Sequence, residues 1–216
     1  MCSESLDGDS YSRDFGECVR EKALERALDT RKFEIDLYWK RASYFWTFIA
    51  ATLAGFLAVR TSSGPARTDT LILLSCLGLV FSLGWLCVNR GSKRWQENWE
   101  YHVDMLEDDI QGPLFKVLLT RLPAATRSER IVELLTGPSP FSVSRINQMI
   151  SIFMTAIWVI LLVDSLLPPR LVDWFPIILV AITVLTCCGF FFLGRTHTGD
   201  HEYRASKRIS RIGHGA

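Results

Sequence analysis

KFEIDLYWKRASYFWTFIAATLAGFLAVR, residues 32–60, decides how the chain is organised. Charged residues alternate with apolar ones up to Arg41, and the 18 residues from Ala42 to Val59 carry no charge. No proline or glycine occurs from Asp29 until Gly55. Because nothing in this stretch breaks a helix, it predicts one helix that passes from a polar, water-facing surface straight into lipid.

Four uncharged runs of this kind are long enough to cross a membrane. They cover Ala42–Val59, Thr70–Asn89, Ile146–Val163 and Trp174–Gly194. A transmembrane helix needs about 20 mostly apolar residues. A chain of 216 residues is too short to bury four such helices as a soluble core. We therefore expect an all-α, polytopic membrane protein with four transmembrane helices.

Basic residues indicate the orientation of these spans. Lysines and arginines gather before the first span, between the second and third, and after the fourth. The two short connections contain only Arg60, Arg67 and Arg170. Since cytoplasmic loops carry the excess of basic residues, we expect both termini and the middle segment to lie in the cytoplasm.

The same pattern divides the chain into six segments. We expect residues 1–14 to be a disordered N-terminus, 15–41 a cytoplasmic helix and 42–89 a transmembrane hairpin. Residues 90–145 should form a cytoplasmic helical segment, 146–194 a second transmembrane hairpin and 195–216 a basic cytoplasmic tail. The first two spans should extend as continuous helices into a cytoplasmic helical hairpin, and Gly112-Pro113 should end the second one after Ile110. Short helices are expected at Leu114–Leu119 and Ser128–Leu135.

Two kinds of helix face are candidates for contacts within the hairpin or between subunits. A stripe of apolar side chains runs along the cytoplasmic part of the second helix at helical spacing: Trp95, Trp99, Val103, Leu106 and Ile110. Small residues, which let helices approach closely, lie along the first two spans: Ala50, Ala54, Gly55 and Ala58, and Ser75, Gly78 and Ser82. We expect the helix at 15–41 to cover part of the tryptophan stripe and a neighbouring subunit to cover the rest.

The sequence contains no recognisable catalytic constellation. The four spans contain no ionisable Asp, Glu, Lys, Arg or His, which argues against an ion-coupled transporter. The six cysteines form no CxxC pair. His197 and His201 stand four residues apart, but Gly199 interrupts the helix that a shared metal would need. The charge balance of 24 basic to 23 acidic residues argues against a nucleic-acid partner. We expect no metal, no cofactor and no enzymatic activity.

The basic tail leaves one enzymatic alternative open. Arg208 and His214 are separated by five residues, which is the R-x5-H spacing used by HEPN-type ribonucleases. A membrane-tethered ribonuclease that uses this pair is therefore one hypothesis for the function.

A family resemblance rests on two aromatic-rich stretches, KFEIDLYWKRASYFWTFIAATLAGFLAV and RWQENWEYHVDMLEDDIQGPLFKVLL. Over about residues 30–120 the chain resembles the RipA family of bacterial inner-membrane proteins, which is described as octameric and takes its name from a factor needed for intracellular growth. The resemblance implies a cyclic homo-oligomer, an octamer, in the bacterial cytoplasmic membrane. The hairpin plan is also similar to small membrane effectors of phage defence, including the SLATT type and the octameric pore-like protein that accompanies type VI-B CRISPR systems.

These observations favour a non-enzymatic, homo-oligomeric inner-membrane protein, an octameric ring, that acts in stress adaptation, host interaction or defence. A pore or channel built from the same ring is the first alternative, in which a hydrophobic constriction would gate the flow of ions. The tethered ribonuclease is the second. The expected partners are other copies of this chain and the lipid bilayer, and the sequence leaves other protein partners open.

Overall fold

The computed structural model describes residues 11–194 apart from residues 12, 120–125, 128–130, 132–135 and 168–173. Four helices organise this part of the chain: α2 at Glu17–Thr61, α3 at Arg67–Leu106, α5 at Val143–Leu166 and α6 at Trp174–Phe192. Each is long and apolar enough to cross a membrane. This confirms the predicted all-α fold with four membrane-spanning helices.

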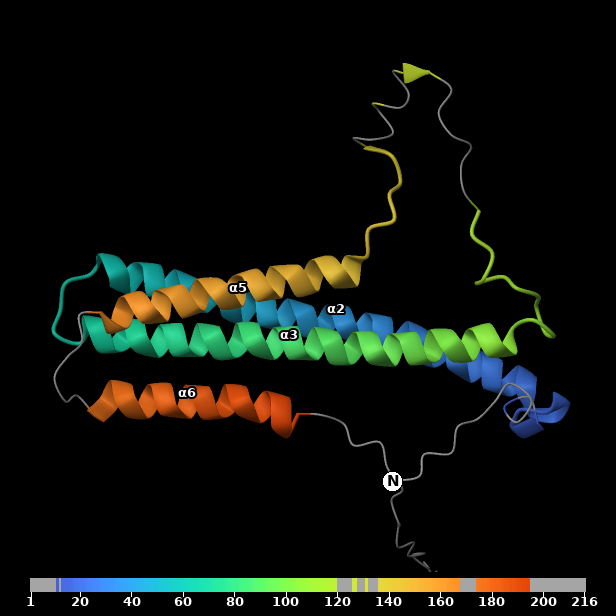
Figure 1. The fold of residues 1–216 in the computed structure, drawn as a ribbon, viewed down its shortest axis with the longest axis horizontal. Coiled ribbons are helices and arrows are strands. Elements are labelled where there is room, and N and C mark those ends of the chain that lie inside the picture. Colours follow the sequence, from blue (N-terminus) through green and yellow to red (C-terminus); the bar gives the residue numbers. More distant parts are fainter. Residues whose placement is uncertain are drawn as a thin grey trace, which may run out of the picture.

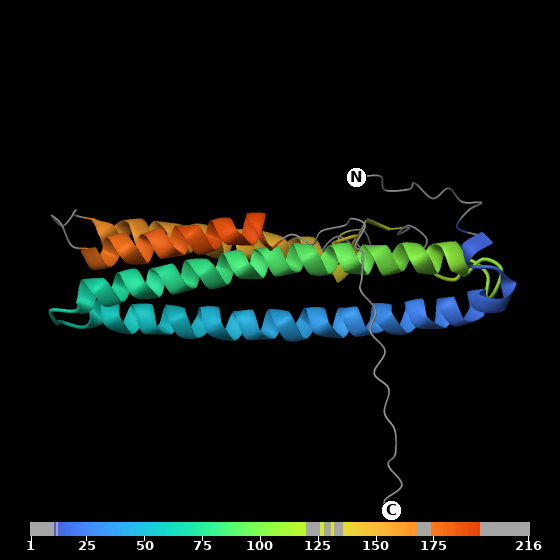
Figure 2. The same cartoon turned by 90° about the horizontal axis from the view of Figure 1, so that it is seen from below.

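The two longest helices form an antiparallel hairpin (Figure 1). α2 has 45 residues and α3 has 40, so at 1.5 Å per residue they are about 68 and 60 Å long, twice the thickness of the hydrocarbon layer. Both run without a break from the apolar run into the charged region, because no proline interrupts either helix. α5 and α6 are shorter and lie beside only one end of the hairpin (Figure 2).

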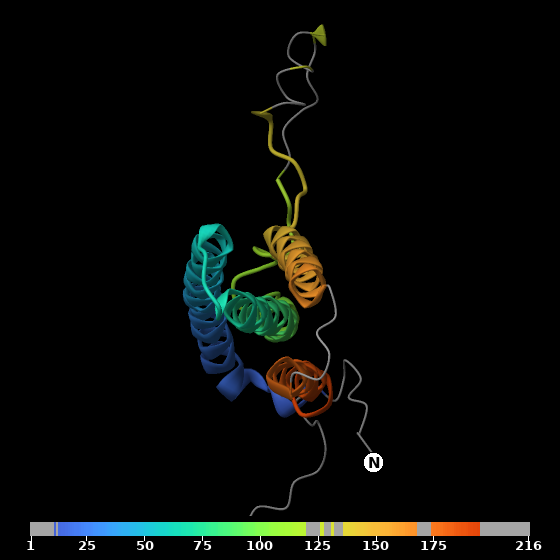
Figure 3. The same cartoon turned by 90° about the vertical axis from the view of Figure 1, so that its left-hand side faces the viewer.

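α3 is the central helix of the bundle. It packs against α2, α5 and α6, and the end-on view shows it between them (Figure 3). Its buried residues recur at alternating spacings of four and three, the period of a left-handed supercoil: Leu71, Ser75, Gly78, Ser82, Trp85, Asn89 and Ser92. Most of these side chains are small, which allows the neighbouring helices to approach α3 closely.

Three apolar clusters hold the helices together. The first lies in the charged part of the hairpin, outside the apolar runs, where Leu24 and Ala27 of α2 meet Val103 and Leu106 of α3. The second joins three helices near the opposite end, with Phe56, Leu71 and Trp158 at its centre. The third joins α3 to α5 and α6 through Ile72, Cys76 and Leu162.

The C-terminal end of α3 differs from the sequence expectation. The helix ends at Leu106 rather than Ile110, and residues 107–119 form turns and irregular chain, so the predicted helix at Leu114–Leu119 is wrong. The reason is the buried side chain of Glu107, whose Oε2 accepts a hydrogen bond of 2.9 Å from the N–H of Phe115. Gly112, with φ of 74°, allows the chain to turn back.

At the same end of the hairpin, α2 begins close to its expected start, at Glu17, directly after Gly16. Most of the N-terminal stretch expected to be disordered lies outside the described residues, as do most of the predicted helix at Ser128–Leu135 and the whole basic tail. Tyr11, which is described, packs against Phe15 with ring centroids 4.6 Å apart.

Candidate functional site

The serine–glycine face of α3 packs inside the chain. A Cβ atom built on Gly78 would lie 2.2 Å from the indole ring of Trp158 in α5, so the ring occupies the space that a side chain would fill. Trp158 is fully buried, and Phe56 of α2 meets it edge-on with ring centroids 6.0 Å apart. Ser75 and Ser82 flank the same contact and are also fully buried. This face therefore joins α3 to α5 within one chain.

The alanine face of α2 has the opposite environment. Ala50, Ala54 and Ala58 are exposed in the single chain. Gly55, on the border of this face, is half-buried, and a Cβ there would make ordinary contact with Leu74 at 3.7 Å. The two small-residue faces predicted from the sequence do not pack against each other.

The tryptophan stripe of α3 is covered along part of its length. Val103 and Leu106 are buried against α2, and Trp99 packs beside them. Trp95, nearer the membrane, keeps 47% of its surface exposed. Ile110 lies beyond the end of α3 and is 37% exposed. Helix α2 therefore covers one end of the stripe and leaves the Trp95 end open.

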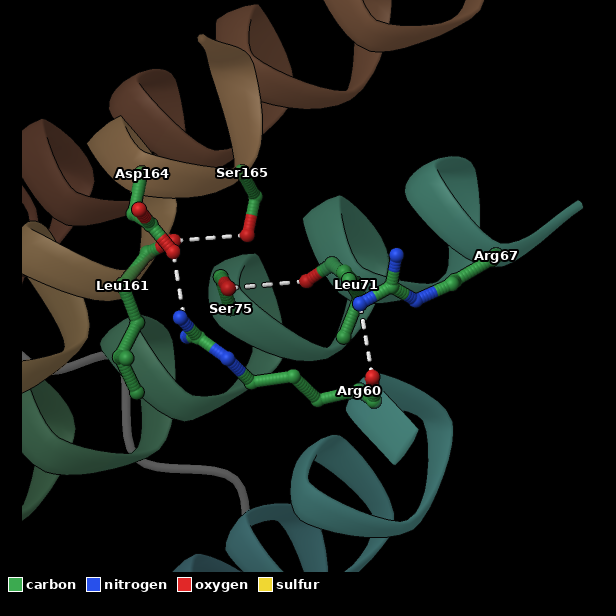
Figure 4. Close-up of polar contacts among 7 residues, drawn as sticks. All are labelled: Arg60, Arg67, Leu71, Ser75, Leu161, Asp164 and Ser165. Atoms are coloured by element: carbon green, nitrogen blue, oxygen red, sulfur yellow. Dashed lines mark hydrogen bonds and ion pairs between the residues drawn. The ribbon is translucent and has the colours of Figure 1, made fainter. Parts of the chain in front are cut away.

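An ion pair joins the ends of α2 and α5 (Figure 4). Arg60 Nη1 lies 3.1 Å from Asp164 Oδ2, and Nη2 of Arg67 donates a hydrogen bond of 2.7 Å to the backbone oxygen of Arg60. Both charged side chains are about half exposed, so in water the pair would contribute at most about 1 kcal/mol. The ion pair connects the C-terminal ends of α2 and α5 beside the N-terminal end of α3.

In the sequence, Arg60 and Asp164 are each recognisable only as a charge that flanks a span. Their pairing could have been recognised, because two spans that end on the same side of the membrane carry opposite charges at those ends. In the structure these ends of α2 and α5 lie together, beside the start of α3 (Figure 1).

A second set of polar contacts lies where the hairpin leaves the apolar region. Nδ2 of Asn147 in α5 donates a hydrogen bond of 2.7 Å to Tyr38 Oη in α2, and both residues are buried. Arg41 Nη1 donates one of 3.1 Å to Ser92 Oγ in α3 and lies 3.8 Å from Glu34. Sequence reasoning missed these partners, because a single polar residue at the edge of an apolar run does not reveal which helix it will meet.

The end of the hairpin formed by the start of α2 and the end of α3 has its own polar contacts. Tyr11 Oη and His102 Nδ1 are 2.8 Å apart, and Arg20 pairs with Asp109. Burial raises the pKa of Tyr11, and the nearby charge of Arg20 opposes this shift. These contacts fasten the start of the chain and the turn after α3 to the end of the hairpin.

The described residues contain no group of three or more metal-ligating side chains. The pair Arg208 and His214, and the histidines at 197 and 201, lie outside the described residues. The features that the described residues do show are contacts between helices.

A comparison with known protein families gives a match to this chain. The family described as "Octameric membrane protein family (8xMP)" matches residues 21–167, more than half of the chain. The chain belongs to the octameric membrane protein family. This confirms the predicted kinship with octameric membrane proteins at the level of the family. No curated protein and no solved structure matches the chain.

Membership of the octameric membrane protein family, together with the four apolar helices, identifies the chain as a homo-oligomeric, multi-pass membrane protein. The matched residues include nearly all of α2, the whole of α3 and all of α5, and they end before α6 begins at Trp174. The three helices joined by Phe56, Gly78 and Trp158 thus belong to the part that the family shares.

Proposed function

We propose that this chain is a non-enzymatic subunit of an octameric ring in a bacterial cytoplasmic membrane, and that the alanine face of α2 forms the contact between subunits. The observation that carries the proposal is the contrast between the two small-residue faces. Ser75, Gly78 and Ser82 are used within the chain, whereas Ala50, Ala54 and Ala58 are exposed. A face that allows close approach and has no cover in its own chain is suited to a neighbouring helix.

The hydropathy of the spans supports the same assignment. The most apolar part of α2 has a mean hydropathy of 1.6, against 2.4, 2.2 and 2.5 for α3, α5 and α6. Of these four helices α2 therefore has the least apolar span. Placing α2 against another subunit leaves α5 and α6, which are more apolar, to face the bilayer.

Exposed aromatic residues also occur on the hairpin beyond the apolar spans. Phe33 of α2 is 57% exposed and Trp95 of α3 is 47% exposed, both in the region that projects from the apolar spans. Large apolar side chains in water mark contact surfaces when they form a patch. We infer that a neighbouring hairpin covers them, so that subunits meet both in the membrane and above it.

In this proposal both termini and the hairpin end face the cytoplasm, because basic residues flank those segments. The biological setting, stress adaptation, host interaction or defence, follows the resemblance to the RipA family and to phage-defence effectors. In any of these settings the ring would act by assembling and by contacting partners rather than by catalysing a reaction.

A pore is the second candidate function, and the low hydropathy of α2 favours it specifically. If α2 from each subunit faces the axis of the ring, its exposed face would line a narrow passage that opens by wetting. Ion flux through liposomes that contain the purified oligomer would distinguish the two candidates: a pore gives flux above that of empty liposomes, and a closed scaffold does not.

The proposed contact can be tested with matched alanine variants. Ala54→Leu adds bulk to the exposed face of α2, and Ala181→Leu adds the same bulk to an exposed position of α6. Because close approach needs small side chains, the first variant should run as smaller particles in mild detergent and the second at the parental size. Light scattering coupled to size-exclusion chromatography measures both.

The cytoplasmic part of the contact has its own variant. Changing Trp95 and Trp99 together to Ser should weaken the oligomer while the four spans still insert. If this double variant keeps the parental size and Ala54→Leu reduces it, the contact lies in the membrane alone. If both variants keep the parental size, the proposed subunit contact is wrong.

A further inference from the structure

A cavity lies between α2, α3 and α6 at the level where the hairpin leaves the membrane. Its volume is about 530 Å³, within the range of sites that hold small molecules. One side is formed by a stripe of α3 that includes Gly84, Val88 and Gly91, and Phe45 and Phe190 contribute from the two neighbouring helices. From Val80 to Gly91 the cavity follows α3 for about 16 Å.

Two glycines give the cavity its shape. A Cβ on Gly84 would touch the rings of Phe45 and Phe190 at 3.5 and 3.6 Å, so these rings close over α3 at that depth. A Cβ on Gly91 would meet nothing within 4 Å, so the cavity is open on this side. It is therefore narrow and apolar toward the middle of the membrane and wider toward the hairpin.

The wide end carries a positive charge. Arg41 lines it, and Arg41 is the last charged residue before the uncharged run of the first span. Its contacts with Ser92 and Glu34 both use Nη1, and a guanidinium has five N–H donors, so donors remain for a phosphate. Gly194, where α6 leaves the membrane, lines the same cavity, and a basic stretch of sequence follows it.

We propose that this cavity binds one anionic phospholipid from the leaflet on the hairpin side, with its phosphate at Arg41 and an acyl chain along Gly91, Val88 and Gly84. An apolar slot that opens at headgroup depth beside an arginine matches both parts of such a lipid. A second copy of the chain is the competing occupant. It is disfavoured because an arginine at the mouth calls for an anion, and Glu34 neutralises it only from 3.8 Å.

The test uses the purified oligomer in mild detergent, incubated with phosphatidylglycerol or with phosphatidylcholine of the same acyl chains. Native mass spectrometry counts the lipids retained per subunit. The intact protein should retain phosphatidylglycerol in preference. Arg41→Gln should lower its retention about five- to tenfold, the loss of one basic contact near the surface, and Arg41→Lys should restore part of it. Glu34→Gln should leave retention unchanged or raise it.

Gly91→Leu would fill the open end of the cavity and should remove retention of both lipids. Gly189→Leu is the matched control, because a Cβ there also meets nothing within 4 Å and Gly189 does not line the cavity; retention should not change. If phosphatidylglycerol is retained equally by Arg41→Gln and the intact protein, the proposal is overturned. It is also overturned if Gly91→Leu reduces the particle size rather than the lipid count, since a neighbouring copy then fills the cavity.

Discussion

Replacing Gly78 with alanine should destabilise the protein more than its single methyl group suggests. The new Cβ would lie 2.2 Å from the indole of Trp158, whereas carbon atoms in contact need about 3.5 Å. The difference, 3.5 minus 2.2, requires the ring or the whole of α5 to move by about 1.3 Å. Trp158 is fully buried against Phe56, so it cannot swing away without disturbing α2 as well.

Overpacking of this kind typically costs about 1–3 kcal/mol. An alanine also favours a helix over glycine by about 1 kcal/mol, so the measurement needs a control that has this gain without the clash. Gly189→Ala provides it, because that glycine is in α6 and a Cβ there meets nothing within 4 Å. We expect Gly189→Ala to be as stable as the parent or more so. Because both variants have the helix gain, Gly78→Ala should be less stable than this control by the overpacking cost alone, about 1–3 kcal/mol.

Unfolding in mixed micelles with increasing sodium dodecyl sulfate, followed by circular dichroism, measures the free energy of unfolding for each variant. Trp158→Phe in the Gly78→Ala background should recover part of the loss, since a smaller ring makes room for the methyl group. Equal stability of Gly78→Ala and Gly189→Ala would refute the view that Trp158 is wedged against this glycine.

Three further predictions concern the ends of the chain and of the helices. Exchanging the charges of the outer ion pair, as Arg60→Asp with Asp164→Arg, should restore the stability lost in either single variant, by up to about 1 kcal/mol in the same unfolding assay; no recovery in the double variant would mean that the pair is not formed. Reporter fusions after Gly64 and in the connection that follows α5 should both read as extracytoplasmic, and a cytoplasmic signal from either would reverse the proposed topology. Changing Arg208 and His214 together to Ala should leave the phenotype and any RNA turnover unchanged, whereas loss of turnover in an intact oligomer would support the ribonuclease hypothesis.

Most of the fold could be predicted from where the charges are missing. Four uncharged runs gave four helices of membrane length, and the absence of a breaker before Gly55 predicted that α2 continues through the boundary. The end of α3 could not be predicted in the same way. It depends on the Glu107 carboxylate reaching the backbone of Phe115, and an acidic residue in a charged helix looks no different in sequence from its solvated neighbours.

Which helix faces pack against each other could not be predicted from the sequence either. Ala50, Ala54 and Ala58 on one span and Ser75, Gly78 and Ser82 on the next have similar small-residue spacing, and the sequence alone treats them alike. What separates them is Trp158, a large side chain more than 70 residues away that occupies only one of the two faces. Such a contact between distant segments leaves no local periodic signal.

The unbroken passage of α2 and α3 through the membrane boundary has a mechanical consequence. Of the roughly 68 Å of α2, less than half fits in the hydrocarbon layer, so the hairpin is a lever whose outer arm is at least as long as its inner one. α2 has no glycine or proline between Glu17 and Gly55, so it lacks the usual sites at which a helix kinks where it leaves the membrane. Any force that tilts the charged tip of the hairpin, where Leu24 and Leu106 pack the two helices together, should therefore move the opposite ends, joined by Arg60 and Asp164, in the reverse direction.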